Sequence, residues 1–560
     1  MSIVILFTFL LFTGAVALAT WWVVRGSDET TDEGYFLAGR SLTGVFIAGS
    51  LLLTNLSTEQ LIGLNASAYK EGMSVMAWEV VAGISLVALA LFFLPRYLKS
   101  GIATIPSFFE ERFGAGVRTL TTFLFVVAYM LILLPFVLYL GATGLNQMLG
   151  LQEMLGMSEI RVIWTVIIFI AVVGGAYAIW GGLKAVAVSD TFNGVGLLTG
   201  GLLITYLSLQ YVAGEGESIF SAFKLISERD PDAFQSMGTL DEEVSWPTLF
   251  TGVLLLNFFY WSSNQQIIQR TFGAKNLAEG QKGVLLAAFF KVCAPLVLVI
   301  PGIAGAYLVA TNPEFAEKVT GASGDPEAKF VYGALVASVL PDALVGFFSA
   351  VVIGSILSTF NSVLNSSATL FSIDVYKNFI RPKASTKEVV RSGQICSFVV
   401  GAFAVVAAPA IFHGKEGLFN IFQQLNGIYF IPILAIMLVG LLNKKVDGRA
   451  AMVALLVGLF AMVMGTFFNG SVPETSETVG VDGWVKDYFK SPFHYMGFVF
   501  ALLVVLQLVL EKVGFSRETP YEQKDVGAVD LTTWKYAYPV GGLLIAFAVG
   551  LYVLLAIVAS

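Results

Sequence analysis

The sequence predicts an all-α integral membrane protein in which two of the spanning helices are broken. Hydrophobic residues make up 56% of the 560 residues and charged residues only 13%, whereas a soluble globular domain carries about 25% charged residues. The mean hydropathy is +0.80. Long apolar runs separated by short polar segments produce these values, and each run matches the ~20 residues that a helix needs to cross a bilayer.

Fourteen apolar runs reach spanning length. We expect the first run to remain a spanning helix rather than a cleaved signal peptide, because no basic segment precedes it and it continues to Arg25. The runs fall near residues 3–24, 43–68, 74–97, 119–147, 161–180, 185–212, 246–268, 283–310, 341–375, 389–412, 417–442, 450–469, 492–511 and 536–558.

The distribution of basic residues predicts the orientation. If the N-terminus lies outside, 22 of the 32 Lys and Arg residues fall in predicted cytoplasmic loops and 9 in outside loops. Cytoplasmic loops of membrane proteins carry such an excess. We therefore expect both termini outside, and the acidic pI of about 5.1 together with short cytoplasmic loops favours a bacterial inner membrane.

Two predicted spans contain polar interruptions. Residues 54–60 read TNLSTEQ, and residues 260–266 read YWSSNQQ. Such stretches are tolerated at membrane depth only where they are buried in protein or line a watery cavity. Paired broken helices, one in each half of a chain, are typical of secondary transporters built from inverted repeats.

Four ionisable residues fall within or against predicted spans, namely Glu59, Glu79, Asp190 and Lys291. Charges at these depths are costly and usually face a bundle interior or an aqueous pathway. Structural ion pairs, or side chains that reach the interface, are the alternative interpretation.

Hydroxyl side chains share one face of the predicted span 341–375. Ser355, Ser358, Thr359 and Ser362 recur at three- and four-residue spacing. A sodium ion binds several mostly neutral oxygens, which such a face and the free carbonyls of a broken helix can supply. Alternatively, these hydroxyls bond to carbonyls of their own helix.

Other classes of protein find little support. Two cysteines and two histidines form no ligand cluster, and the chain shows no nucleophile–base pair or phosphate loop, so we expect no enzyme and no nucleic-acid partner. An uncoupled membrane sensor remains an alternative, but the longest predicted cytoplasmic loops have only about 25 residues, too few for a signalling domain.

Several blocks of sequence occur together in one order. The chain resembles the sodium/solute symporter family, most closely its sodium/sugar (galactose/glucose-type) branch, over residues from about 30 to 440. The similar blocks are GYFLAGRSL at 34–42, NLSTEQ at 55–60, GIATIP at 101–106, WGGL at 180–183 with Asp190, YW at 260–261 with Asn264, Gln265, Gln269, Arg270 and QKG at 281–283, and LNSSAT at 364–369 with Asp374 and Tyr376.

The resemblance implies a LeuT-like fold with a five-plus-five inverted repeat. Residues 1–30 would contain an extra N-terminal helix and the start of the first cytoplasmic loop. The repeats would occupy residues 43–212 and 246–442, and residues 450–560 would form additional helices. Each interruption then falls in the first helix of its repeat.

The resemblance also implies a sodium site. Its ligands would be the carbonyls of Leu53, Leu56 and Ser355 and the hydroxyls of Ser358 and Thr359. Asp190 would assist sodium exit toward the cytoplasm or, with Ser362, help to hold a second sodium ion. Asn361 stands where relatives with two sodium sites carry a hydroxyl, so the number of sodium ions stays open.

For the transported solute, the resemblance implies a sugar pocket with an inner and an outer gate. Ala82 replaces a sugar-contacting serine of the family, which places galactose itself in question. The pocket would use Asn55, Gln60, Glu79, Asn257, Tyr260, Trp261, Lys291 and Gln423, with Tyr260 as the inner gate and Leu64, Tyr139 and Phe419 as the outer gate.

Several alternatives remain open for the solute, which could be an inositol-like polyol, sialic acid or an amino acid. An acidic solute normally requires an arginine, and no arginine falls in the middle of a predicted span. Coupling to protons instead of sodium also stays open. We expect a monomer or a weak dimer in the lipid bilayer.

Overall fold

The computed structural model describes residues 3–25, 31–240, 242, 244–321, 324–468 and 491–559, without the side chains of residues 32–33, 176–181, 468 and 557–559. Trp180 and Gly181 of the WGGL block therefore lie outside the described side chains. The described residues form helices and no strand, with only isolated bridges such as the one between Leu42 and Ala274. The prediction of an all-α protein is confirmed.

In the first half of the chain, short π and 3₁₀ segments (η) connect or interrupt the α-helices. The elements are α1 (Ile3–Val24), α2 (Asp32–Leu37), η1 (Ala38–Arg40), α3 (Gly44–Asn55), η2 (Glu59–Leu64), α4 (Asn65–Glu71), η3 (Gly72–Met76), α5 (Ala77–Ala88), η4 (Leu89–Phe93), α6 (Leu94–Ser100), α7 (Ile105–Phe113), α8 (Ala115–Ala128), η5 (Tyr129–Leu133), α9 (Leu134–Leu149), α10 (Leu151–Leu155), α11 (Glu159–Ala213) and α12 (Ile219–Arg229).

The second half also consists of α-helices with short interruptions, and it ends in three further long helices. The elements are η6 (Trp246–Phe250), α13 (Gly252–Ser262), α14 (Gln265–Phe272), α15 (Leu277–Cys293), α16 (Pro295–Leu298), α17 (Ile300–Thr311), α18 (Pro313–Val319), α19 (Ala328–Val339), α20 (Asp342–Thr369), η7 (Leu370–Ile380), α21 (Thr386–Phe412), α22 (Leu418–Leu442), α23 (Gly448–Phe468), α25 (Pro492–Lys512) and α26 (Ala537–Ala559).

Ten helices of the described chain are long and apolar enough to span a membrane, or eleven if the pair α15 and α17, bent by 43°, is one span. Three of the fourteen predicted spans fall outside that count. Runs 43–68 and 246–268 are each divided into shorter helices, and run 161–180 is the part of α11 before a kink at Gly182. Gly182 has φ 54°, a conformation that favours glycine.

Both polar interruptions break their helices. Helix α3 ends at Asn55, where the Leu56 amide bonds to the Leu52 carbonyl at 2.6 Å, and helical structure resumes with η2. In the second interruption, the amides of Ser263 and Asn264 both donate to the Phe259 carbonyl, and α14 begins one residue later. The prediction of two broken helices is confirmed.

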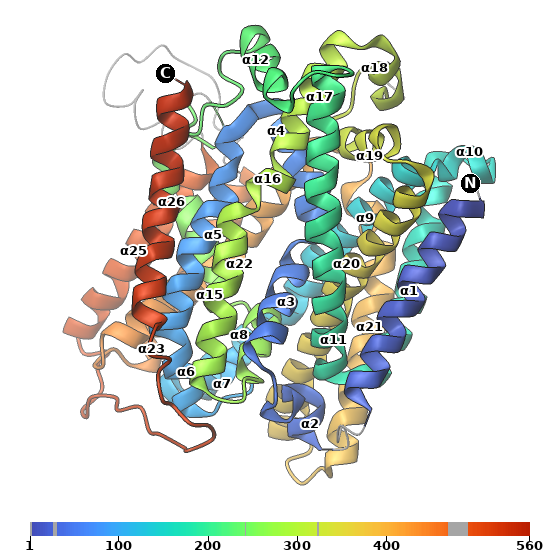
Figure 1. Cartoon of the computed structure of the whole chain (residues 1–560). Coiled ribbons are helices and arrows are strands. Elements are labelled where there is room, and N and C mark those ends of the chain that lie inside the picture. Colours follow the sequence, from blue (N-terminus) through green and yellow to red (C-terminus); the bar gives the residue numbers. More distant parts are fainter. Residues whose placement is uncertain are drawn as a thin grey trace.

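The helices form one bundle in which the broken helices lie at the centre. Figure 1 shows α1 and α26 on opposite flanks and both chain ends at the upper end of the bundle. Helix α3 packs against α11, α15 and α20, and α13 packs against α5 and α22. This packing surrounds both breaks with helices from the two halves of the chain.

Several helices lie where the sequence indicated loops, among them α12, α18 and α19. Helices α12 and α18 lie at the upper end of the bundle (Figure 1). Helix α19 is apolar but has only 12 residues, below the length of a span. The fourteen-run prediction therefore missed it.

Candidate functional site

A buried cavity lies between the two broken helices and their neighbours. About 400 Å³ of space lies between the atoms that line it. Its lining includes all eight residues predicted for the solute: Asn55, Gln60, Glu79, Asn257, Tyr260, Trp261, Lys291 and Gln423.

The eight residues come from six elements far apart in the sequence. Asn55 is the last residue of α3, and Gln60 lies in η2 just after the first break. Glu79 comes from α5, the residues Asn257, Tyr260 and Trp261 from α13, and Lys291 from α15. Gln423 comes from α22. The breaks bring polar side chains to the centre of an otherwise apolar bundle.

Lys291 is the charged centre of this cavity. Its side chain is 0% exposed, and its Nζ pairs with the Glu79 carboxylate. The same Nζ donates to Asn55 Oδ1 at 2.5 Å and lies 5.6 Å from the centroid of the Trp261 ring. A buried ammonium needs such partners, because desolvation of an unpaired charge costs several kcal/mol.

Aromatic rings form part of the cavity wall. The rings of Tyr260 and Trp261 meet edge to face at 5.2 Å, and the Tyr260 ring lies 6.4 Å from that of Phe430. Gln266 Nε2 donates to the Tyr260 hydroxyl at 3.3 Å. A wall that combines aromatic faces with amides suits a solute that has both apolar and hydroxyl-bearing surfaces.

The sequence interpretation missed several residues of the cavity, of which Glu59 and Trp78 matter most. Both line the cavity. Glu59 was recognised as an ionisable residue inside a span but was not assigned to the pocket. Each residue directly precedes a predicted pocket residue, and neighbouring residues on a helix differ in direction by about 100°. Because of this difference in direction, the sequence gave no reason to place two neighbouring residues, such as Glu59 and Gln60, in the same cavity.

A second, larger pocket, named the outer pocket after the side that the sequence predicts to face outside, opens at the surface, since the Glu416 side chain at its rim is 87% exposed. About 740 Å³ of space lies between its atoms, and Phe419 forms part of its lining. The Phe419 ring meets the ring of Trp78, a cavity residue, edge to face at 5.6 Å. These two rings therefore separate the pocket from the cavity.

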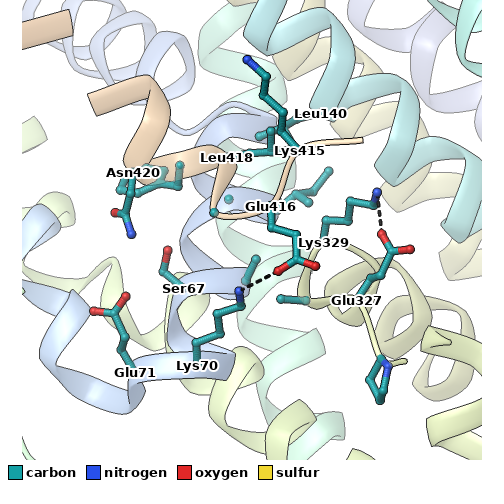
Figure 2. Close-up of a pocket in the computed structure, with 17 residues that line it drawn as sticks. Ser67, Lys70, Glu71, Leu140, Glu327, Lys329, Lys415, Glu416, Leu418 and Asn420 are labelled. Carbon is teal, nitrogen blue, oxygen red and sulfur yellow. Dashed lines mark ion pairs between the residues drawn. The ribbon is translucent and has the colours of Figure 1, made fainter. Parts of the chain in front are cut away.

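Charged residues surround this outer pocket. Figure 2 shows Lys70 and Glu416 directed toward each other, with 3.8 Å between Nζ and Oε2. The Nζ of Lys329 lies 2.5 Å from the Glu327 carboxylate on the neighbouring wall. Lys70 ends the helix pair that begins at the first break, so this ion pair connects that helix to the segment before α22.

The other two predicted outer-gate residues lie elsewhere. Leu64 and Tyr139 are both fully buried, and neither lines the cavity or the outer pocket. The Tyr139 hydroxyl lies 3.4 Å from His413 Nδ1, and its ring packs near Phe412. Of the predicted outer gate, only Phe419 stands at the boundary between the two spaces.

The predicted sodium ligands come together where α20 meets the first break. The Thr359 hydroxyl donates to the Thr54 carbonyl at 2.9 Å, which joins the two elements. Ser358 is buried, and its hydroxyl interacts with the Asp190 carboxylate. The Ser355 hydroxyl bonds to the Val352 carbonyl of its own helix at 2.8 Å. Leu53 and Leu56 lie on the facing helix end.

Asp190 lies beside this region on α11 and is fully buried. Its Oδ2 accepts a hydrogen bond from Ser50 at 2.6 Å, and its carboxylate also interacts with the hydroxyls of Ser358 and Thr54. Ser362 Oγ lies 3.3 Å from Thr54 Oγ1 and accepts a hydrogen bond from Arg270 Nη2 at 2.7 Å. The residues predicted for a second sodium ion therefore lie close to a guanidinium group.

Arg270 corrects part of the sequence interpretation, which expected no arginine deep in a span. The residue lies on α14, two positions past the predicted end of run 246–268, and is 1% exposed. Helix α14 continues past the break to Phe272, so a residue counted as part of a loop lies in a buried helix. Arg270 does not line the solute cavity.

Sequence comparison places the chain among transporters. A model of the Sodium:solute symporter family matches residues 35–458. Over 94% of its length, the chain is 39% identical to an uncharacterized symporter of Escherichia coli (strain K12), YidK, of which 87% is covered. It is 31% identical to a sodium/glucose cotransporter of Vibrio parahaemolyticus, with 84% of this chain and 87% of that protein covered.

Comparison with solved structures confirms the fold. A Na⁺-coupled sialic acid symporter in an outward-open, substrate-bound state superposes with a TM-score of 0.74 at 18% identity, covering 93% of this chain and 99% of that one. The LeuT-like fold is therefore shown, and the helices that cross the bilayer make this an integral membrane protein. The chain belongs to the sodium:solute symporter family.

Proposed function

We propose that this sodium-coupled symporter imports a small sugar by alternating access. The observation that carries the proposal is the cavity itself, which combines the amides of Asn55, Gln60 and Gln423 with an aromatic wall. A sugar presents hydroxyls that both donate and accept hydrogen bonds, and amides answer both roles. The similarity to a sodium/glucose cotransporter supports the same class of solute.

The charges in the cavity argue against an acidic solute. Lys291 is its one basic residue, and its ammonium is already paired with Glu79 and bonded to Asn55. Arg270 lies outside the lining. A carboxylate entering this space would be left without a cation, at a cost of several kcal/mol. Sialic acid and free amino acids fit this cavity less well than a neutral sugar or an inositol-like polyol.

Sodium would bind between the first break and α20 and stabilise the arrangement that receives the solute. The carbonyls of Leu53, Leu56 and Ser355 and the hydroxyls of Ser358 and Thr359 are the proposed ligands. The buried Ser358 hydroxyl, which lies beside the Asp190 carboxylate, supports this assignment. For each sodium ion carried inward, the membrane potential contributes ~2.3 kcal/mol per 100 mV to solute accumulation.

Alternating access would open one side of the cavity at a time. Phe419 and Trp78 close the outer side in this structure, and Tyr260 is the proposed inner gate. Asp190, close to the sodium ligands and bonded to Ser50, would receive the ion on its way to the cytoplasm. Sodium release would then weaken the contact between the two repeats and let the solute leave.

Uptake into proteoliposomes tests this proposal. We would measure accumulation of radiolabelled glucose, galactose and myo-inositol with and without an inward sodium gradient, for the native protein and for Ser358→Ala and Gln423→Ala. We expect one of the sugars to accumulate with sodium, and both variants to lose that accumulation. Accumulation of myo-inositol alone would identify a polyol transporter, and sodium-independent equilibration of every solute would contradict coupling.

Matched variants control for damage to the fold. Thr199→Ala removes a hydroxyl that bonds only within α11, and Gln210→Ala removes an amide at the end of the same helix. We expect both controls to retain native uptake. Loss of uptake in these controls as well would attribute the effects to folding rather than to the two sites.

A further inference from the structure

The solute cavity contains more acidic than basic groups. Two carboxylates, Glu59 and Glu79, and one ammonium, Lys291, line it. The exposed fractions of the three residues are 1%, 1% and 0%. If all three were ionised, the cavity would hold one uncompensated negative charge in a medium of low dielectric constant.

The contacts of Lys291 show which of the two carboxylates is not paired with a cation. Lys291 is paired with Glu79 and donates to Asn55, and its ammonium faces the Trp261 ring. None of these three contacts of Lys291 involves Glu59. The Oε2 atom of Glu59 is buried and has no hydrogen-bond partner. Glu79 and Lys291 therefore form a neutral pair, and Glu59 stands beside it.

Among the residues that the structure describes, no further cation comes close enough to balance Glu59. The ionisable groups that act on Glu59 are Lys291 and Glu79, and the neighbouring Tyr260 feels its charge. The helices packed around η2 carry two lysines, Lys70 of α4 and Lys329 of α19, but both line the outer pocket and pair there with Glu416 and Glu327. The same helices carry tyrosines, such as Tyr139 of α9 and Tyr332 of α19, which are neutral at ordinary pH. Arg270 lies beyond Tyr260 and is bonded to Ser362 near Asp190.

A carboxyl group that loses its water and gains no partner keeps a proton rather than its charge. We propose that Glu59 is a protonated acid in the solute cavity and donates its hydrogen to an oxygen of the bound solute. The cavity is then neutral as a whole and selects uncharged solutes. This inference rests on the proposed function, because it assumes that this cavity receives the solute.

The chemistry of the neutral acid matches a hydroxyl-bearing solute. A protonated carboxyl group offers one donor and an acceptor, whereas an ionised one only accepts. Glu59 as an acid can bond a solute oxygen that has no hydrogen, such as a ring oxygen, as well as a hydroxyl. Glu59 as an anion would instead favour a solute that carries an ammonium group, such as an amino sugar.

Infrared spectroscopy tests the protonation state without any solute. Purified protein in lipid is compared with Glu59→Gln, and the difference spectrum is searched for the carbonyl stretch of a protonated carboxylic acid. We expect the native protein to show a band that Glu59→Gln lacks, while Glu314→Gln, which changes an exposed carboxylate on α18, keeps it. A carboxylate band lost in its place would overturn the proposal.

Binding measurements test the role of the proton. Glutamine has the shape of the protonated acid and likewise offers both a donor and an acceptor. Glu59→Ala should therefore bind the transported sugar about tenfold or more weakly than the native protein, and Glu59→Gln should recover most of that loss. The heat of binding should not depend on the ionisation enthalpy of the buffer. Proton uptake on binding, or an affinity lost equally in both variants while both remain folded, would overturn the proposal.

The two proposals fail in different ways. If the native protein binds an amino sugar more tightly than its neutral parent and Glu59→Gln reverses this order, Glu59 is an anion, and the inference falls while the symporter assignment stands. If the protein binds no sugar of either kind, the solute assignment falls, and the infrared band still decides the state of Glu59.

Discussion

Lys291 is the residue on which the geometry of the cavity depends most. Its ammonium pairs with Glu79 from α5 and bonds to Asn55 at the end of α3. Replacement of one member of a buried ion pair leaves the other charge without compensation, which costs about 3–5 kcal/mol. Replacement of both members removes that penalty.

We therefore expect Lys291→Met to lower the free energy of unfolding by about 3–5 kcal/mol and to abolish uptake. Lys291→Met combined with Glu79→Gln should recover most of the lost stability without restoring uptake. Thermal unfolding in detergent of the two single variants and the double variant measures the coupling. If the loss of unfolding free energy in the double variant equals the sum of the losses in the two single variants, Lys291 and Glu79 do not stabilise each other.

Ala82 gives a prediction at the same scale. It lines the cavity at the position where the resemblance implies a sugar-contacting serine. Ala82→Ser should strengthen binding of galactose by about 0.5–1.5 kcal/mol, the net value of one hydrogen bond, as measured by competition with a labelled sugar. Ala88→Ser on the same helix, away from the cavity, should have no effect. Equal changes in both variants would contradict a role for position 82.

Single residues show what the sequence could and could not predict about the site. Residues that the resemblance supplied, such as Gln423, lie in the cavity as expected. Glu59 and Trp78 were missed because local spacing does not tell which neighbours on a helix converge with side chains from other helices. Arg270 was missed because hydropathy does not show that helix α14 continues past the break to Phe272.

Among the helical elements, the two breaks were the most predictable feature, because seven consecutive mostly polar residues cannot lie against lipid. Less predictable was the outer gate. Leu64 and Tyr139 were expected beside Phe419, but Trp78 from α5 is its partner across the boundary. Contacts between helices depend on their rotation and tilt, which a single sequence does not specify.

This boundary predicts how the cavity becomes accessible. We expect Phe419→Ala to speed the reaction of a membrane-impermeant thiol reagent with Ala82→Cys, because the ring no longer covers the cavity. The native Cys293 and Cys396 would first be replaced by serine. Phe398→Ala, which removes an exposed ring of α21, serves as the control. An unchanged labelling rate with Phe419→Ala would show that the barrier lies elsewhere.

At the scale of the whole molecule, the hydropathy of the sequence predicted the arrangement of the chain ends. Fourteen runs imply an even number of crossings, and the two chain ends lie at the same end of the bundle (Figure 1). The short helix α19 escaped prediction because its 12 residues lie between polar segments. The repeat boundaries at 43–212 and 246–442, and the choice of which end faces outside, remain predictions.

The orientation can be tested by labelling single cysteines in a background without native cysteines. Thr239→Cys lies in a segment predicted to be outside, and Lys383→Cys lies in a predicted cytoplasmic loop. In right-side-out vesicles we expect an impermeant thiol reagent to modify position 239 at once and position 383 only after permeabilisation. The reverse pattern would invert the orientation.

The central claim is that sodium beside the first break and a sugar in the adjacent cavity stabilise each other. Titration of the purified protein measures sugar affinity with and without sodium, and sodium affinity with and without sugar. We predict that each ligand raises the affinity of the other by the same factor, as linkage requires, and that Ser358→Ala removes this coupling. Equal sugar affinity in sodium and in choline would contradict the account.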